Sequence, residues 1–300
     1  MMFIIIRVVN ITLQIFSILL HGFGLYLLHI LFLNDQADVQ HLYIAHLSIT
    51  EMLSLLCLFV WGVLAFLQSY TTNNTQVIVH YIDIVLTLLL YPIMYCNMIF
   101  IVVDKVLEIY WNILYHQYWN MRRAKILEWC TFGISFLVCS CIITSYNTIN
   151  NFDYKEIPKV YLRPIGDVVF LCTATVSYTY IFYKYKLSQN GTTTDIQSSN
   201  ISLFTTFRNS RFFISACLVI TYIVFTILPN WMTVFTTLLK FQGKNQHIML
   251  PLLGTLYSLS LVSDACVYVL LDRKVQRIWL KLLRTFRHRV RLSDDSEERI

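Results

Sequence analysis

The sequence predicts an all-α membrane protein, in which seven transmembrane helices form a single-domain bundle over residues 1–300 and a short amphipathic helix follows them. Three observations lead to this prediction. Of the 300 residues, 57% are hydrophobic and only 13% are charged, whereas soluble domains carry roughly 25% charged residues. The mean hydropathy is +0.59. Seven apolar stretches also reach the length of about 20 residues that a helix needs to cross a bilayer.

The seven stretches follow one another with polar breaks between them. The first ends at Asn34–Gln36 and the second at Tyr70–Asn74. The first is too long for the apolar region of a signal peptide, and no small-residue cleavage site follows it. The third and seventh are the least hydrophobic because they contain internal polar residues. The spans are expected at about 8–33, 42–67, 77–110, 126–146, 165–187, 212–239 and 248–271.

An amphipathic helix is expected at about 272–288, after the last span. Its apolar residues recur at helical spacing and basic residues occupy the other face. Such a helix lies on a membrane surface. Residues 289–300 form an acidic, disordered tail in this interpretation. The apolar positions are Val275, Ile278, Trp279, Leu282 and Leu283.

The basic residues predict the orientation. With seven spans, 17 of the 23 Lys and Arg residues lie on the side of the C-terminus. Because the side richer in Lys and Arg is cytoplasmic, we expect an extracellular N-terminus and a cytoplasmic C-terminus, in the plasma membrane. All eight Cys residues fall within the spans, so no disulfide between outer loops is expected.

Ionisable residues inside the spans are costly and therefore mark candidate functional sites. Glu51 and Asp264 lie at similar depth in the second and seventh spans. Two carboxylates at one depth repel each other unless a cation or a shared proton lies between them. This pair therefore predicts a Na⁺ or H⁺ site, although interior polar groups also serve to pack helices together.

Several short motifs, taken in order, resemble those of rhodopsin-like (class A) G-protein-coupled receptors, and the resemblance covers essentially the whole chain. Residues 46–51 are similar to the Asn-Leu-Ala-x-x-Asp motif of the second helix, with Glu51 as the acid. Asp104-Lys105-Val106 stands where the family has Asp-Arg-Tyr. Trp129 corresponds to a family Trp in the fourth helix. The remaining matches are Tyr178 in the fifth helix, the stretch from Phe225 to Pro229 in the sixth, Asp264-Ala265-Cys266-Val267-Tyr268 in the seventh, and the amphipathic helix.

The departures from the family indicate a divergent member. Lys105 replaces an Arg, Ala265 replaces a Pro, and Ile227 stands where a Trp is usual. The disulfide of the third helix and the proline of the fifth are also missing. Melanocortin receptors lack that cysteine and proline as well, and residues 103–125 are similar to theirs. The chain looks like an invertebrate orphan receptor of that neighbourhood.

The resemblance implies which residues bind a ligand and which switch the receptor. Thr87 stands where amine receptors have an Asp, which disfavours a monoamine, and the seventh span has no Lys for retinal. The expected ligand is a small molecule, a lipid or a short peptide. The candidates for ligand binding are Asp83, Thr87, Asp167, Trp61 and Tyr257. The candidates for coupling to a heterotrimeric G protein are Asp104, Lys105, Tyr178, Pro229 and Tyr268.

Other functions remain as alternatives. An ion- or proton-coupled transporter using Glu51 and Asp264 is the second choice, although seven spans do not divide into two equal repeats. An enzyme is not expected, because no His-Glu-x-x-His, Gly-x-Ser-x-Gly or paired metal-ligand motif occurs. No cofactor and no nucleic-acid partner are expected. Membrane lipids are expected partners of the basic loops and the amphipathic helix.

Overall fold

A computed structural model describes residues 2–67, 78, 81–82, 84–111, 114–148, 163–190, 211–232 and 246–297. No strand occurs within these ranges. Seven helical segments are long and apolar enough to cross a membrane, which confirms the all-α, seven-span prediction. These segments are Val8–Leu33, Val39–Trp61, Leu86–Trp111, Met121–Thr144, Pro164–Lys184, Phe213–Met232 and Gly254–Leu271.

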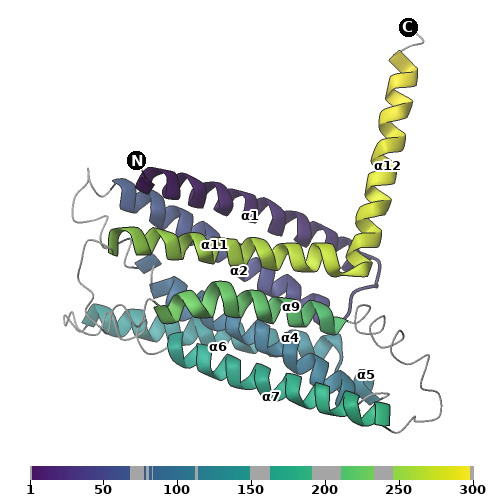
Figure 1. Ribbon diagram of the computed structural model, residues 1–300, viewed down its shortest axis with the longest axis horizontal. Coiled ribbons are helices and arrows are strands. Elements are labelled where there is room, and N and C mark those ends of the chain that lie inside the picture. Colours follow the sequence, from purple (N-terminus) through teal and green to yellow (C-terminus); the bar gives the residue numbers. More distant parts are fainter. Residues whose placement is uncertain are drawn as a thin grey trace.

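The helices run alternately up and down the bundle (Figure 1). The third span joins a π-helical turn, η1, to α4, and the sixth joins α9 to the π-helical turn η5. The elements are α1 (Met2–Leu33), α2 (Val39–Leu67), η1 (Leu86–Leu90), α4 (Tyr91–Trp111), α5 (Tyr115–Tyr118), α6 (Met121–Thr148), α7 (Arg163–Asn190), α9 (Arg211–Tyr222), η5 (Ile223–Ile227), α11 (Gln246–Leu271) and α12 (Arg273–Glu297).

Helix α4 is the centre of the bundle. It packs against α2, α6, α7 and α9, while α11 closes the ring by packing against α1 and α9. The third span is also the most buried of the seven, and the fourth, in α6, is the least buried. Polar groups on α4 and on the facing sides of α2 and α11 are therefore removed from lipid.

The outer surface of the bundle is apolar. Large side chains such as Leu19, Trp129 and Val176 are exposed on it, while Glu51 and Asp264 are buried inside. This is the reverse of the distribution in a soluble protein, where charged groups cover the surface. A lipid environment accounts for it, because apolar side chains facing hydrocarbon have no desolvation penalty.

Short polar side chains begin the helices at the end of the bundle where α12 starts, which we call the α12 end. The Asp38 carboxylate accepts a hydrogen bond from the backbone N–H of His41 at 3.4 Å, and Asn120 accepts one from Arg123 at 3.1 Å. Each satisfies an N–H group that the first turn of a helix leaves without a partner. Asp35 turns the chain between α1 and α2 with a φ of 53°, a conformation that Asp tolerates better than most residues.

Helix α12 leaves the bundle across the direction of the other helices (Figure 1). At its base, Val275 of α12 is buried against the bundle, and the Trp279 ring of α12 meets the Phe23 ring of α1 edge-on with 4.9 Å between centroids. The predicted end at residue 288 and the disordered tail from 289 were wrong, because α12 continues to Glu297. Residues 289–297 contain no Pro or Gly, so nothing in them ends a helix.

Several predicted features lie outside the described residues. These are Asp83, the part of the sixth span from 233 to 239, and residues 298–300.

Candidate functional site

A buried polar cluster lies in the middle of the bundle and is organised by His21 of α1. Its Nδ1 lies 2.8 Å from Ser48 Oγ and 3.0 Å from the Tyr268 hydroxyl, which in turn are 2.8 Å apart. Its Nε2 lies 3.0 Å from the carbonyl oxygen of Leu261. A carbonyl only accepts hydrogen bonds, so Nε2 carries the proton and Nδ1 accepts. The neutral imidazole thus satisfies both nitrogens and ties α1, α2 and α11 together.

Close packing of α1 against α11 allows this cluster to form. Gly24 lies against the Tyr268 ring, and a Cβ at this position would overlap the ring atoms. A larger residue would therefore push Tyr268 away from His21 and Ser48. His21 is an ionisable residue in the middle of the first span, a signal that the sequence-based prediction did not use. Gly24 had no such signal, because its partner Tyr268 comes from a helix far away in the chain.

Glu51 and Asp264 meet in the same cluster, as their similar depth predicts. Their side chains are 0% and 1% exposed, and the two carboxyl groups lie near enough to interact electrostatically, while both Glu51 oxygens and Asp264 Oδ2 make no hydrogen bond within the described residues. Thr221 donates a 2.5 Å hydrogen bond to Asp264. His21 Nε2 lies 3.5 Å from Glu51 Oε2, farther than it lies from the Leu261 carbonyl.

This carboxyl pair needs a positive partner or a proton. Two buried carboxylates near each other repel unless one of them is protonated or a cation lies between them. Within the described part of the chain, no Lys or Arg pairs with either residue. The same part holds no group of three His, Cys, Asp or Glu side chains arranged for a metal ion. The arrangement can therefore share a proton or hold a weakly bound monovalent cation.

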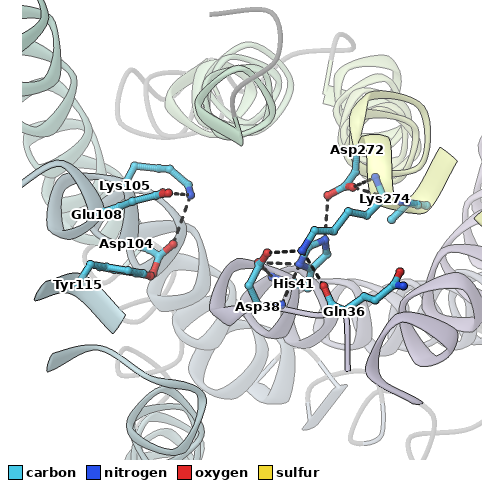
Figure 2. A network of polar contacts seen from close by, with 10 residues as sticks. Gln36, Asp38, His41, Asp104, Lys105, Glu108, Tyr115, Asp272 and Lys274 are labelled. Carbon is cyan, nitrogen blue, oxygen red and sulfur yellow. Dashed lines mark hydrogen bonds and ion pairs between the residues drawn. The ribbon is translucent and has the colours of Figure 1, made fainter. Parts of the chain in front are cut away.

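A charged network occupies the α12 end of α4 (Figure 2). Tyr115 of α5 donates a hydrogen bond to the Asp104 carboxylate. The Lys105 ammonium lies 3.6 Å from Asp104 but only 2.7 Å from Glu108. Burial, reinforced by the Asp104 carboxylate, raises the pKa of Tyr115, so the phenol keeps the proton that it donates. Asp104 and Lys105 are therefore each held by a residue outside the Asp-Lys motif.

The sequence-based prediction named Asp104 and Lys105 but not Glu108, which is the closer partner of Lys105. Glu108 follows Lys105 by three positions, a spacing that puts two side chains on the same side of a helix. That spacing was visible in the sequence and could have identified Glu108. Tyr115 could not have been identified in this way, because α5 folds back onto α4 through a short connection.

The other candidate switch residues lie in three places. Tyr178 of α7 and Ser215 of α9 are joined by a 2.8 Å hydrogen bond between their hydroxyl groups. Tyr268 belongs to the His21 cluster. Pro229 lies two residues after η5, and because proline lacks an N–H group, the helix loses a hydrogen bond there.

The candidate ligand-binding residues lie at different depths and on different helices. Thr87 is buried within η1, and Tyr257 is buried with its ring edge-on to Tyr91. Trp61 is half-buried on α2. Asp167 is fully buried on α7 and accepts a hydrogen bond from Tyr95 of α4. Its carboxylate therefore joins the third and fifth spans inside the bundle.

Two neighbouring residues of α6 differ from what the family resemblance suggests. The Trp129 side chain is 70% exposed on the outer surface. Glu128 points inward instead, with Oε2 at 3.4 Å from Nδ1 of His46 on α2. A Trp at this position is compatible with lipid contact, and the polar link between α2 and α6 is made by the residue before it.

Compared with protein-family models and with curated proteins, the chain matches none of them. The functional interpretation therefore depends on the fold and on the residues described above.

Proposed function

We propose that the protein is a G-protein-coupled receptor of the plasma membrane, which transmits the binding of an extracellular ligand to a heterotrimeric G protein. The observation that carries this proposal is the Asp104–Lys105 pair at the α12 end of the central helix, held by Tyr115 and Glu108. The seven spans and the helix after them supply the matching framework. The order of motifs along the chain resembles the rhodopsin-like class.

The sixth span offers the element that moves. Its π turn, η5, lies just before Pro229, and both features weaken the regular hydrogen bonding of a helix. The part of the span on the α12 side is linked to α7 by the Tyr178–Ser215 hydrogen bond and packs against α11 and α4. An outward tilt of this part would open the α12 end around Lys105 for the G protein.

The ligand would shift the equilibrium between the two packings by binding one of them more tightly. We propose a small molecule, a lipid or a short peptide as the ligand. Asp83, Thr87, Trp61, Asp167 and Tyr257 remain the candidates for its binding. The buried Glu51–Asp264 pair would respond to the same equilibrium, because a proton or Na⁺ bound there stabilises the packing that brings the carboxyl groups together.

A comparison of Lys105 variants tests the coupling role. An Arg offers five donors in a fixed fork and would contact Asp104 and the G protein more firmly than Lys does. We expect Lys105→Arg to strengthen G-protein activation by about 1 kcal/mol, roughly fivefold, at equal surface level. Lys105→Ala should abolish activation. If Lys105→Arg leaves G-protein activation unchanged and Lys105→Ala still activates the G protein, Lys105 has no role in coupling.

The orientation has a separate test. An epitope tag after Ile300 should be stained only in permeabilised cells, because most basic residues lie on that side. Staining of intact cells would reverse the orientation and place the Asp104–Lys105 pair outside, where no G protein reaches it.

A proton- or ion-coupled transporter is the second candidate, and the Glu51–Asp264 pair favours it. A buried carboxyl pair that takes up and releases a proton is a common coupling device in transporters. Proteoliposomes loaded with a pH-sensitive dye separate the two functions. A transporter would move protons across the membrane in the presence of substrate, and a receptor would not.

A further inference from the structure

A second ionic cluster joins the base of α12 to the turn between α1 and α2 (Figure 2). The His41 ring is 2% exposed and lies between two carboxylates. Nδ1 is 2.6 Å from Asp38 Oδ1, and Nε2 is 3.0 Å from Asp272 Oδ2. Lys274 completes the cluster, with its ammonium 3.1 Å from Asp38 Oδ2 and 2.7 Å from the carbonyl oxygen of Gln36.

The two flanking carboxylates favour the charged form of the His41 ring. A positive charge within 3.0 Å of both carboxylates is stabilised by each of them, and with a proton on each nitrogen the ring can donate toward Asp38 and toward Asp272. The backbone N–H of Asp38 lies 3.2 Å from Nδ1, but the carboxylate oxygen is much closer. A neutral ring would place a lone pair against one of the two carboxylates. The imidazolium is therefore the form that holds this cluster together.

Asp272 connects the cluster to the start of α12. Its Oδ1 accepts hydrogen bonds from the backbone N–H groups of Lys274 at 2.7 Å and Val275 at 3.2 Å. Burial by itself would raise the pKa of Asp272, but the hydrogen bond and the charge of His41, together with these two N–H groups, lower it below its usual range. The carboxylate that begins α12 is thus ionised and bound to His41 at the same time.

We propose that Asp38, His41, Asp272 and Lys274 form a proton-dependent latch, in which the His41 imidazolium holds the base of α12 against the bundle and loss of its proton releases α12. With the ring protonated, the two carboxylates and the two cations balance. Without that proton, two carboxylates face a single ammonium in a buried place. This proposal goes beyond the proposed receptor function and does not depend on it.

Water and protons can reach the latch. A cavity of about 530 Å³ lies between it and the end of α4, and is lined by Asp35, Gln36, Ala37, Asp38, Glu108, Lys274 and Arg277. The charged groups that face His41 from the turn and from α12 are Asp38, Asp272 and Lys274. Across the cavity, Asp104 and Glu108 on α4 are held by Tyr115 and Lys105. Release of α12 would move Lys274 and Arg277 and change the shape of this cavity.

Hydrogen–deuterium exchange of the full-length protein in nanodiscs tests the latch. Protection of residues 272–280 should fall as the pH rises from about 5 to about 9, the range in which histidine changes charge. Since one proton is lost on opening, the opening equilibrium should increase about tenfold per pH unit once the ring begins to titrate. Chemical exchange itself also accelerates with pH, so variants are compared with the native protein at each pH.

Two variants and a control make the result decisive. His41→Gln should leave residues 272–280 weakly protected at every pH, without the pH-dependent fall. Asp272→Asn keeps the cap of α12 but removes one of the two carboxylates that favour the His41 imidazolium. The loss of protection of residues 272–280 should therefore begin at lower pH. His29→Gln is the matched control, because His29 is an exposed histidine of α1 outside the cluster. A native pH response in His41→Gln, or an equal loss in His29→Gln, would overturn the proposal. If His41→Gln does not fold, the proposal is overturned when Asp272→Asn loses protection of residues 272–280 at the same pH as the native protein.

Discussion

The middle of the bundle and its α12 end use the same residue types in different ways. In the middle, Glu51 and Asp264 lie together with hydroxyl groups and a neutral imidazole around them. At the α12 end, Asp104 and Asp272 are each held by a donor or a cation close by. Charge is expensive where water is absent, so the first cluster must share a proton or an ion. Asp272, whose pKa is lowered by His41 and by two backbone N–H groups, keeps its charge instead.

This difference teaches how depth assigns roles to carboxyl groups. A group in the middle of the membrane changes its charge when its surroundings change, which suits a switch that follows helix packing. A group near the end keeps its charge and exchanges partners instead. The following four predictions test this contrast, from the largest expected effect to the smallest.

Removal of His21 should cost the most, because three helices lose their common partner. His21→Leu leaves the Leu261 carbonyl, Ser48 and Tyr268 without the ring, and we expect a loss of about 3 kcal/mol in the free energy of unfolding. Thermal unfolding in detergent measures it. The exposed His29, changed to Leu, should have little effect. Equal losses for the two variants would mean that the central cluster adds no special stability.

Removal of one acid from the central pair should have the opposite sign. Glu51→Gln or Asp264→Asn relieves the repulsion between two buried carboxyl groups, and we expect stability to rise by about 1–2 kcal/mol. The variants should also lose any dependence of stability and basal signalling on Na⁺ or pH. If both variants keep the native ion and pH dependence, the pair serves only to pack the helices.

Tyr115→Phe tests the α12 end of the central helix. Asp104 would keep Lys105 at 3.6 Å but lose its phenol donor. A buried carboxylate that loses one hydrogen bond costs about 1–2 kcal/mol, and the freed acid should draw Lys105 away from Glu108. Basal G-protein activation should therefore fall. Glu108→Gln is the matched comparison, since it removes the closer partner of Lys105 and leaves Asp104 with its phenol donor. It should also draw Lys105 toward Asp104 and lower basal activation, without the loss of stability expected for Tyr115→Phe.

Asp272→Asn should have the smallest effect and a clear pH dependence. Because the pKa of Asp272 is lowered in the folded protein, its carboxylate stabilises the fold at neutral pH, and this stabilisation is lost as the pH falls through the lowered value. We expect the variant to be less stable than the native protein by about 1 kcal/mol at pH 7. The two proteins should converge in acid, below about pH 3. A constant difference across this range would contradict the ionic role.

Much of the fold followed from simple patterns. Runs of about 20 apolar residues are long enough to cross a bilayer, and polar breaks end them, so the seven spans could be located without a structure. The end of α12 could not, because residues 289–297 are polar enough to be read as a disordered tail and yet contain no residue that stops a helix.

The candidate site was predicted only in part. Glu51 and Asp264 were paired from their depth alone, and the structure brings them together. Asp104 and Lys105 were found through a motif. The residues that complete these groups are His21, Tyr115 and Glu108, and only the last has a sequence spacing that points to its partner. The three-residue spacing of Asp38 and His41 pointed to one acid of the latch, whereas Asp272 lies near the other end of the sequence and no pattern along the chain connected it to His41.

The sequence by itself determined that this chain spans a membrane seven times and carries acids inside it, because hydrophobic length and the cost of buried charge depend on local composition. The tertiary structure decided which acids share a proton, which ones keep a cation, and how α12 is attached. Those outcomes depend on side chains separated by as many as 247 positions, as for His21 and Tyr268. Only the packing of the helices brings such residues within hydrogen-bonding distance.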